Sequence, residues 1–481
     1  MKKINSIFTT LICIMVFLFV GCDSQLDLTP NSQLASQDAL NSLSDLETAL
    51  TGSYSGMQSR TYYGRNLGGF AHMTSDNSLI PGGAGSFLNF EPFYQMTYTP
   101  ANGATATWAQ MYDIIARVNN VINNADGVDG VEADRNRIKG EALFIRALAH
   151  HDLLRLFAQD YKFTADAGHL GVPYITVSEI GSPSRNTVAE CYGFILNDLS
   201  DAIGLMDNGS ERASIDAPSF GSVSAAKAIR ARIYLYMGEY ANALTDADDV
   251  INNGGFTLAP YKVDDGAGGV DLSQIDSWSN RAPNSESIFE LEFDEQDGLW
   301  TTSSLSRLFK PQPNGFGEAG PNLDIVDMYT ATDVRKNWII EVDGQNFINK
   351  YPDNDDVLLN FTVPVVRLTE MYLTKAESHA NLNQTTEARD AINNITLRAN
   401  VGEITSSGAQ LLSNILDERR RELAFEGHRF FDIKRLQLDI VRNDCSLQNN
   451  CTVAYGDKLY AYPIPQEEID ANPNMEQNTG Y

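Results

Sequence analysis

One spacing of small and apolar residues occurs twice in this chain and limits what it can fold into. The first copy is Ala231, Tyr234, Gly238, Tyr240, Ala243, Ala247 and Val250. The second copy is Ala376, His379, Asn383, Thr385, Ala388, Ile392 and Ile395. Small residues let two antiparallel helices approach closely, and Gly or Asn permits the left-handed turn between them. The pattern predicts two helix–turn–helix units of tetratricopeptide type, separated by inserted segments.

Helical periodicity extends over much of the chain. Apolar residues recur at helical spacing in 38–57, 107–125, 133–158, 188–206, 224–252, 366–381, 385–398 and 410–438. Three long stretches between them are rich in Gly, Pro, Asn and Ser: 61–103, 258–300 and 310–360. Their aromatic content favours folded binding loops with short strands over disorder. We therefore expect a mostly α fold, in which tetratricopeptide-like helix pairs form a scaffold with long irregular loops and a few short strands.

The amino terminus has the features of a secretory signal. Lys2 and Lys3 precede an apolar run that ends at Val20, and Gly21 and Cys22 follow. A cysteine directly after such a small residue predicts a bacterial lipoprotein, with a signal peptide over 1–21 and lipid attached to Cys22. An ordinary signal peptide and a single membrane-spanning anchor are the alternatives, although the run is short for a span of about 20 residues.

The charge of the chain excludes one class of partner. It has 35 basic and 63 acidic side chains, for a formal net charge of −28. A nucleic acid needs a basic footprint, so no nucleic-acid partner is expected. A strongly negative surface suits a secreted protein that must stay dispersed.

The remaining cysteines allow one disulfide. Cys445 and Cys451 flank a polar loop of suitable length for a bridge in an oxidising compartment, and the sequence leaves open whether they are joined. Cys191 lies beside an apolar helical pattern, which favours a buried, inert thiol.

Motifs for catalysis or metal binding are absent from the sequence. The six histidines have no ligand spacing, and the acidic turns 264–265 and 353–356 lack a calcium-loop pattern, although calcium is not excluded. No nucleophile elbow or phosphate loop occurs in its usual context. Carboxylate pairs such as Glu290 and Glu292 leave a glycosidase possible, because such an enzyme needs only two carboxylates at the right separation. We expect no enzyme, no cofactor and no metal site.

The densest charge lies in 410–438. Glu418 and Glu422 are one helical turn apart, as are Arg421 and Phe425. This pattern favours an ion-pair network that holds the helix to its neighbours, with Gly427 allowing close approach. An anion site or an acid–base cluster is the alternative.

The long loops carry aromatic residues that can stack on a sugar ring or a peptide side chain. The candidate ligand contacts are Trp278, Trp300, Trp338, Tyr62, Tyr63 and Phe316. Most rings in such loops belong to a core, and the sequence does not show which of these reach the surface.

Several segments together resemble the SusD/RagB family over nearly the whole chain. They are KGEALFIRALAHHDLLRLF at 139–157, RNTV at 185–188, RLTEMYLTKAE at 367–377, ERRRELAFEGHR at 418–429, YPIP at 462–465 and QNTGY at 477–481. The chain departs from the family pattern at His150 and His151, where an aromatic pair is usual, and at Phe19 in the lipid box.

The resemblance implies a surface-exposed outer-membrane lipoprotein of Bacteroidota-type bacteria. Such a protein captures oligosaccharide or polysaccharide, or in some members a peptide, and passes it to a SusC-like TonB-dependent transporter. By this resemblance we divide the chain into a signal peptide at 1–21, a SusD-like N-terminal part at 22–220 and a RagB/SusD-like C-terminal part at 221–481, the last two forming one body. A surface glycosidase and an adaptor that binds only protein are the alternatives, and no catalytic residue is carried over.

Overall fold

The structure is a computed structural model that describes most of the chain. The described residues are 40–81, 89–212, 218–261, 263–264, 270–271, 285–293, 304–311, 313, 315–351, 361–443 and 450–481. Within these ranges no helix is both long and apolar enough to cross a membrane.

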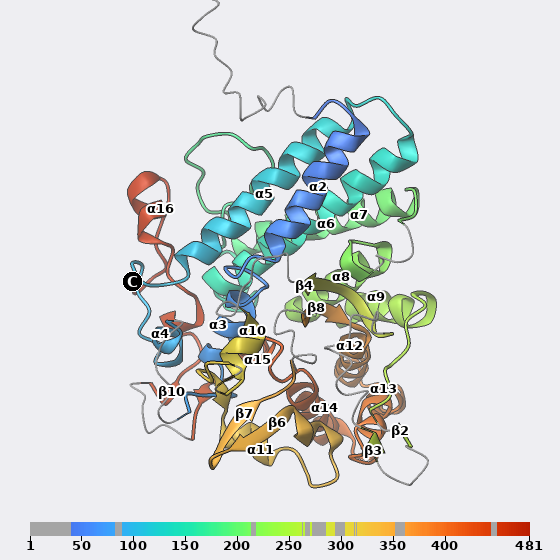
Figure 1. Ribbon diagram of the computed structural model, residues 1–481, viewed down its shortest axis with the longest axis vertical. Coiled ribbons are helices and arrows are strands. Elements are labelled where there is room, and N and C mark those ends of the chain that lie inside the picture. Colours follow the sequence, from blue (N-terminus) through green and yellow to red (C-terminus); the bar gives the residue numbers. More distant parts are fainter. Residues whose placement is uncertain are drawn as a thin grey trace, which may run out of the picture.

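A scaffold of packed helices dominates the molecule (Figure 1). Its helices are α2 (Leu43–Met57), α5 (Thr105–Ala125), α6 (Glu132–Phe157), α7 (Val188–Asp207), α8 (Val223–Met237), α9 (Tyr240–Asn253), α12 (Leu368–Asn381), α13 (Thr385–Arg398) and α14 (Gly408–Glu422). Each packs on the next in this order from α2 to α13, and α14 packs on α12. The mostly helical fold predicted from periodicity is confirmed.

The two repeated patterns form two helix pairs, α8–α9 and α12–α13. Gly238 ends α8 with a φ of 81°, and Asn383 follows α12 with a φ of 61°, so both turns use the left-handed conformation. Helix α9 packs directly on α12, although more than 110 residues separate them in the chain. The segment inserted between α9 and α12 does not interrupt the packing of these two helices.

The charged segment 410–438 is two helices, not one. Helix α14 ends at Glu422, and α15 (Arg429–Arg435) follows a turn in which Phe425 and Gly427 have φ values of 69° and 81°. A Cβ on Gly427 would lie 3.1 Å from the Cα of Gly68. The close approach predicted for Gly427 is therefore present, and it requires the chain to turn rather than continue as a helix.

The regions predicted as loops contain short elements. The helices there are α3 (Asn66–Thr74), α4 (Glu91–Tyr94), α10 (Leu305–Phe309), α11 (Leu323–Asp327) and the 3-10 helix Val334–Trp338. The antiparallel strand pairs are β1 (Ser78–Leu79) with β5 (Gly320–Pro321), β2 (Val263–Asp264) with β3 (Val270–Asp271), β4 (Ser287–Phe293) with β8 (Phe361–Arg367), and β6 (Ile339–Val342) with β7 (Gln345–Ile348). Beyond them lie β9 (Ile440–Val441), paired with β10 (Thr452–Val453), the 3-10 helix Lys458–Tyr460 and α16 (Gln466–Ala471). Helix α3 is almost wholly buried, which its Gly-rich sequence did not predict.

A buried ion-pair network joins α14 to the inserted elements. The Glu422 carboxylate accepts hydrogen bonds from Arg335 at 2.8 Å, Arg367 at 2.9 Å and Arg398 at 2.8 Å. Burial alone would raise the pKa of Glu422, but the three guanidinium groups hold it well below its usual range. The ion-pair network favoured by the sequence is confirmed, because the Glu422 carboxylate and the three guanidinium groups bind one another.

We predict that Glu422→Gln destabilises the fold by about 3–5 kcal/mol, because three buried guanidinium groups would lose their shared negative charge. Urea unfolding monitored by circular dichroism measures the effect. Glu403→Gln is the matched control, since Glu403 is exposed, and it should change the free energy of unfolding by less than about 0.5 kcal/mol. Equal unfolding midpoints for the two variants would contradict the central role of this network.

Candidate ligand-binding site

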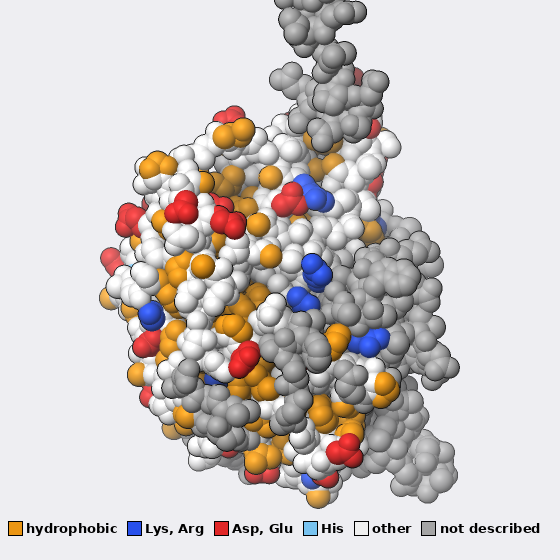
Figure 2. Space-filling model, turned by 60° about the vertical axis from the view of Figure 1, so that its left-hand side comes forward, with side chains coloured by type: hydrophobic (Ala, Val, Ile, Leu, Met, Phe, Trp, Pro, Cys, Tyr) orange, Lys and Arg blue, Asp and Glu red, His pale blue; other side chains and the backbone are white. Residues whose placement is uncertain are grey.

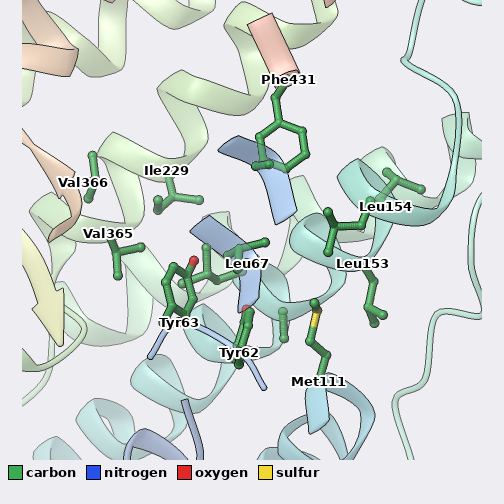
Figure 3. Close-up of a cluster of buried hydrophobic side chains, with 14 of the residues drawn as sticks. Tyr62, Tyr63, Leu67, Met111, Leu153, Leu154, Ile229, Val365, Val366 and Phe431 are labelled. Carbon is green, nitrogen blue, oxygen red and sulfur yellow. The ribbon is translucent and has the colours of Figure 1, made fainter. Parts of the chain in front are cut away.

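Tyr62 and Tyr63 lie in the hydrophobic core. Their side chains are 0% and 7% exposed, and both hydroxyl groups donate to the Oδ2 atom of Asp152, at 2.6 and 2.7 Å. Figure 3 shows both rings among buried apolar side chains that include Leu67 and Met111. The structure therefore corrects their prediction as ligand contacts. The two rings bury apolar area, and their hydroxyl groups satisfy hydrogen-bond acceptors of the buried Asp152 carboxylate.

Trp338 is also a core residue. Its side chain is 1% exposed and packs edge-on against Tyr261, with the ring centroids 5.8 Å apart. The Nζ atom of Lys350 lies 3.7 Å from the Trp338 ring centroid, in a cation–π contact. A ligand at the surface cannot reach this ring, so its prediction as a ligand contact is corrected too.

Other predicted residues fall outside the described part of the chain. Trp278, Trp300, Cys22 and Cys445 do so, and their roles stay predictions. Cys451 is described and disulfide-bonded, with its partner outside the described residues. Cys191 is the buried free thiol that the sequence favours, and burial raises its pKa to about 11.

Phe316 is half-buried and belongs to a surface built where three loop segments meet. Its backbone N–H donates to the carbonyl of Arg307 at 2.8 Å, which places it against α10. The backbone N–H of Leu305, at the start of α10, donates to the carbonyl of Gly64 at 3.0 Å, just before α3. We call the group formed by Arg60, Arg65, Arg307 and Phe316 the α3–α10 surface.

Arg307 is an unpaired cation on this surface. Its side chain is 8% exposed, and its Nε atom has no hydrogen-bond partner. Within the described part of the chain, no carboxylate forms an ion pair with the Arg307 guanidinium group. Burying a charge is costly unless it is paired, so this residue opposes stability in the unliganded fold.

Arg65 and Arg60 add further positive charge. Arg65 is half-buried, its guanidinium carbon lies 5.3 Å from the ring centroid of Phe90, and its Nε atom donates to Asn66 at 3.1 Å. Burial and, to a smaller extent, the nearby charge of Arg60 lower the pKa of Arg65 to about 10, and the charge of Glu318 opposes both effects. Sequence reasoning missed these arginines, because they are scattered through the loops without a motif.

A metal site and a carboxylate pair are the other kinds of chemistry that the chain could support. The described residues contain no cluster of three or more His, Cys, Asp or Glu side chains able to hold a metal ion. On β4, Glu292 is exposed and Glu290 is buried, and burial raises the pKa of Glu290 to about 7, with the neighbouring charge of Glu292 acting in the same direction. A glycosidase needs two carboxyl groups in different environments, but β4 is paired with β8 and packed on the scaffold helix α8, and Glu290 is buried there.

We predict that the buried Glu290 carboxyl makes the stability of the fold depend on pH. Its folded pKa of about 7 lies above the ordinary value of 4.5, so the folded state binds more protons and loses stability as pH rises from about 4.5 through 7. Glu290→Gln should remove this loss, which thermal unfolding at a series of pH values would measure. Parallel stability curves for the two proteins over this range would contradict the prediction.

We predict that Arg307→Met leaves the fold as stable as before or stabilises it, because the change removes a buried, unpaired charge and keeps most of the side-chain volume. Differential scanning calorimetry measures the melting temperature. The control is Arg117→Met, which breaks an exposed ion pair with Asp113 and should change stability little. A clear loss of stability for Arg307→Met alone would show that this arginine has a structural partner.

The fold and this surface define a class: a helical scaffold of tetratricopeptide-like pairs that presents an irregular face bearing aromatic and cationic groups. Comparison with known families gives the same class. Residues 349–481 match the SusD family, and residues 25–235 match a family described as starch-binding and associating with the outer membrane.

The chain belongs to the SusD family. It is 26% identical to a SusD-like protein of Formosa agariphila over 97% of this chain and 98% of that protein. It is 32% identical to the starch-binding protein SusD of Bacteroides thetaiotaomicron over 27% of this chain and 22% of that protein. A crystal structure of a sugar-binding protein of Bacteroides vulgatus, assigned that role provisionally, is 29% identical, covers 92% of this chain and 99% of that chain, and superposes with a TM-score of 0.82.

Proposed function

We propose that this protein is a cell-surface lipoprotein that captures an oligosaccharide or polysaccharide and delivers it to a SusC-like TonB-dependent transporter. The observation that carries the proposal is family membership along the chain, through relatives that include a starch-binding protein and a protein assigned as sugar-binding. SusD-like proteins are binding proteins, and we propose that this chain likewise binds its glycan without cleaving it.

Lipid attached to Cys22 would hold the mature chain at the outer membrane. Acyl chains are stabilised in a bilayer by roughly 0.8 kcal/mol per buried methylene, so two or more chains anchor a protein firmly. The proposal gives the scaffold helices and the loop face separate tasks. The helices provide a rigid body for the transporter to hold, and the loop face contacts the glycan.

Phe316 supports glycan capture on the loop face. It is half-buried, which leaves part of its ring able to stack on a sugar while the rest is fixed by the fold. Trp278 and Trp300 stay in the proposal as additional contacts, because they lie in the inserted stretch 258–300, which precedes the stretch that holds Phe316.

We predict that Phe316→Ala weakens glycan binding by about 5-fold to 50-fold, as loss of one stacking ring should, while the melting temperature changes little. Isothermal titration calorimetry with laminarin, starch, xylan, polygalacturonate and chondroitin sulfate measures binding, and chromatography of each mixture tests for cleavage. Phe194→Ala is the matched control, since Phe194 is 41% exposed on the scaffold helix α7.

Saturable binding without cleavage products, lost on Phe316→Ala and kept in Phe194→Ala, is the expected result. Binding of no polysaccharide in the panel, or release of new reducing ends, would overturn the proposed function. A peptide library tested in the same way addresses the peptide-binding alternative.

A further inference from the structure

The arginines of this acidic chain fall into two groups. Most buried ones are engaged by carboxylates, as Arg232 is by Glu370 at 2.6 Å and Arg335 by Asp333 at 2.8 Å. Arg60, Arg65 and Arg307 form no ion pair with a carboxylate among the described residues. A chain with a formal net charge of −28 has ample acidic side chains, so the lack of pairing on the α3–α10 surface requires a separate explanation.

The three unpaired arginines are neighbours in the fold. Arg60 and Arg65 flank the turn before α3, and the charge of Arg60 acts on Arg65. Glu318 also acts on Arg65, and it follows Phe316, whose N–H is bonded to the carbonyl of Arg307. The backbone segments that carry the three arginines therefore adjoin one another, and Arg60 and Glu318 are the charged groups that act on Arg65.

Arg307 points most strongly to a ligand. Its side chain is more than nine-tenths buried, and its Nε–H is unused inside the protein. A guanidinium group presents its N–H donors in a rigid fork that matches a carboxylate or a sulfate. An anion bound there would satisfy both the missing hydrogen bond and the missing charge.

An aromatic ring accompanies the cations. Phe316 is half-buried, and its backbone N–H donates to the carbonyl of Arg307, so a sugar ring stacked on Phe316 would lie beside the segment that carries this arginine. Figure 2 shows one face of the molecule, on which several Lys and Arg side chains are visible and Asp and Glu are more numerous toward the upper left. Hydrophobic side chains lie between them on the same face.

We propose that the α3–α10 surface binds an anionic substituent, so that the captured polymer is an acidic polysaccharide carrying uronate carboxylates or sulfate esters. This inference rests on the proposed glycan-binding function and specifies the class of glycan. Arg307 and Arg65 provide the charge-assisted hydrogen bonds, Arg60 raises the local potential, and Phe316 stacks on the sugar ring.

The test compares polymers that differ only in charge. Titration calorimetry of the full chain uses polygalacturonate against its methyl ester, and chondroitin sulfate against desulfated chondroitin, with neutral laminarin as a third arm. We expect the charged member of one pair to bind at least about 10-fold more tightly, with an affinity that falls as sodium chloride is raised. The pair that shows the difference distinguishes carboxylate from sulfate.

Variants locate the effect. Arg307→Met and Arg65→Gln should each weaken binding of the charged polymer by about 10-fold or more, whereas Arg117→Met should not. Neutral glycans that bind as well as charged ones, or charged-polymer binding that survives both substitutions in folded protein, would overturn the inference and leave the proposed function intact. Absence of any glycan binding would instead overturn the proposed function itself.

Discussion

The Glu422 carboxylate is the point at which the scaffold and the loop face are joined. It lies at the end of α14 and accepts hydrogen bonds from a 3-10 helix through Arg335, from the end of β8 through Arg367 and from α13 through Arg398. Isolated, any of these charges would be costly to bury, but together they satisfy one another. The arrangement fixes long insertions onto a helical stack that could have formed without them.

The same residue type serves two purposes in this fold. Arg335, Arg367 and Arg398 are held by carboxylates and contribute to a rigid interior. Arg65 and Arg307 form no ion pair with a carboxylate among the described residues, and Arg307 is buried without one. Proteins commonly retain unfavourable groups where binding needs them, since optimising such a site for stability removes its function. Unpaired cations on an otherwise acidic protein are therefore the clearest functional signal in the structure.

Periodicity in the sequence predicted the scaffold because its helices bury one stripe of small and apolar residues against the next. Both left-handed turns followed from Gly238 and Asn383 in the repeated pattern. The loop face was harder to predict. Tyr62 and Tyr63 stand in a Gly-rich segment that suggests a binding loop, yet they hydrogen-bond to Asp152, nearly 90 residues away in the sequence. Local composition cannot show such a distant partner, and the same is true of Tyr261, which packs on the buried Trp338 ring.

The arginines of the α3–α10 surface were not predicted because a missing ion-pair partner leaves no pattern in the sequence. Arg335 forms ion pairs with carboxylates, whereas Arg307 forms none with the described residues. The sequence has 63 acidic side chains, so it does not show which arginine will be paired. Only the three-dimensional structure shows that Arg335 is paired with carboxylates and that Arg307 is not paired with one among the described residues. The density of charge in the segment 410–438 was evident in the sequence, but the break between α14 and α15, where Phe425 and Gly427 have positive φ values, was not.

A crystal structure of this chain with an acidic oligosaccharide tests the account most directly. The account predicts a carboxylate or sulfate oxygen within about 3 Å of the Arg307 guanidinium group and a sugar ring stacked on Phe316. An ordered oligosaccharide bound elsewhere on the molecule, with the α3–α10 surface unchanged and empty, would contradict it.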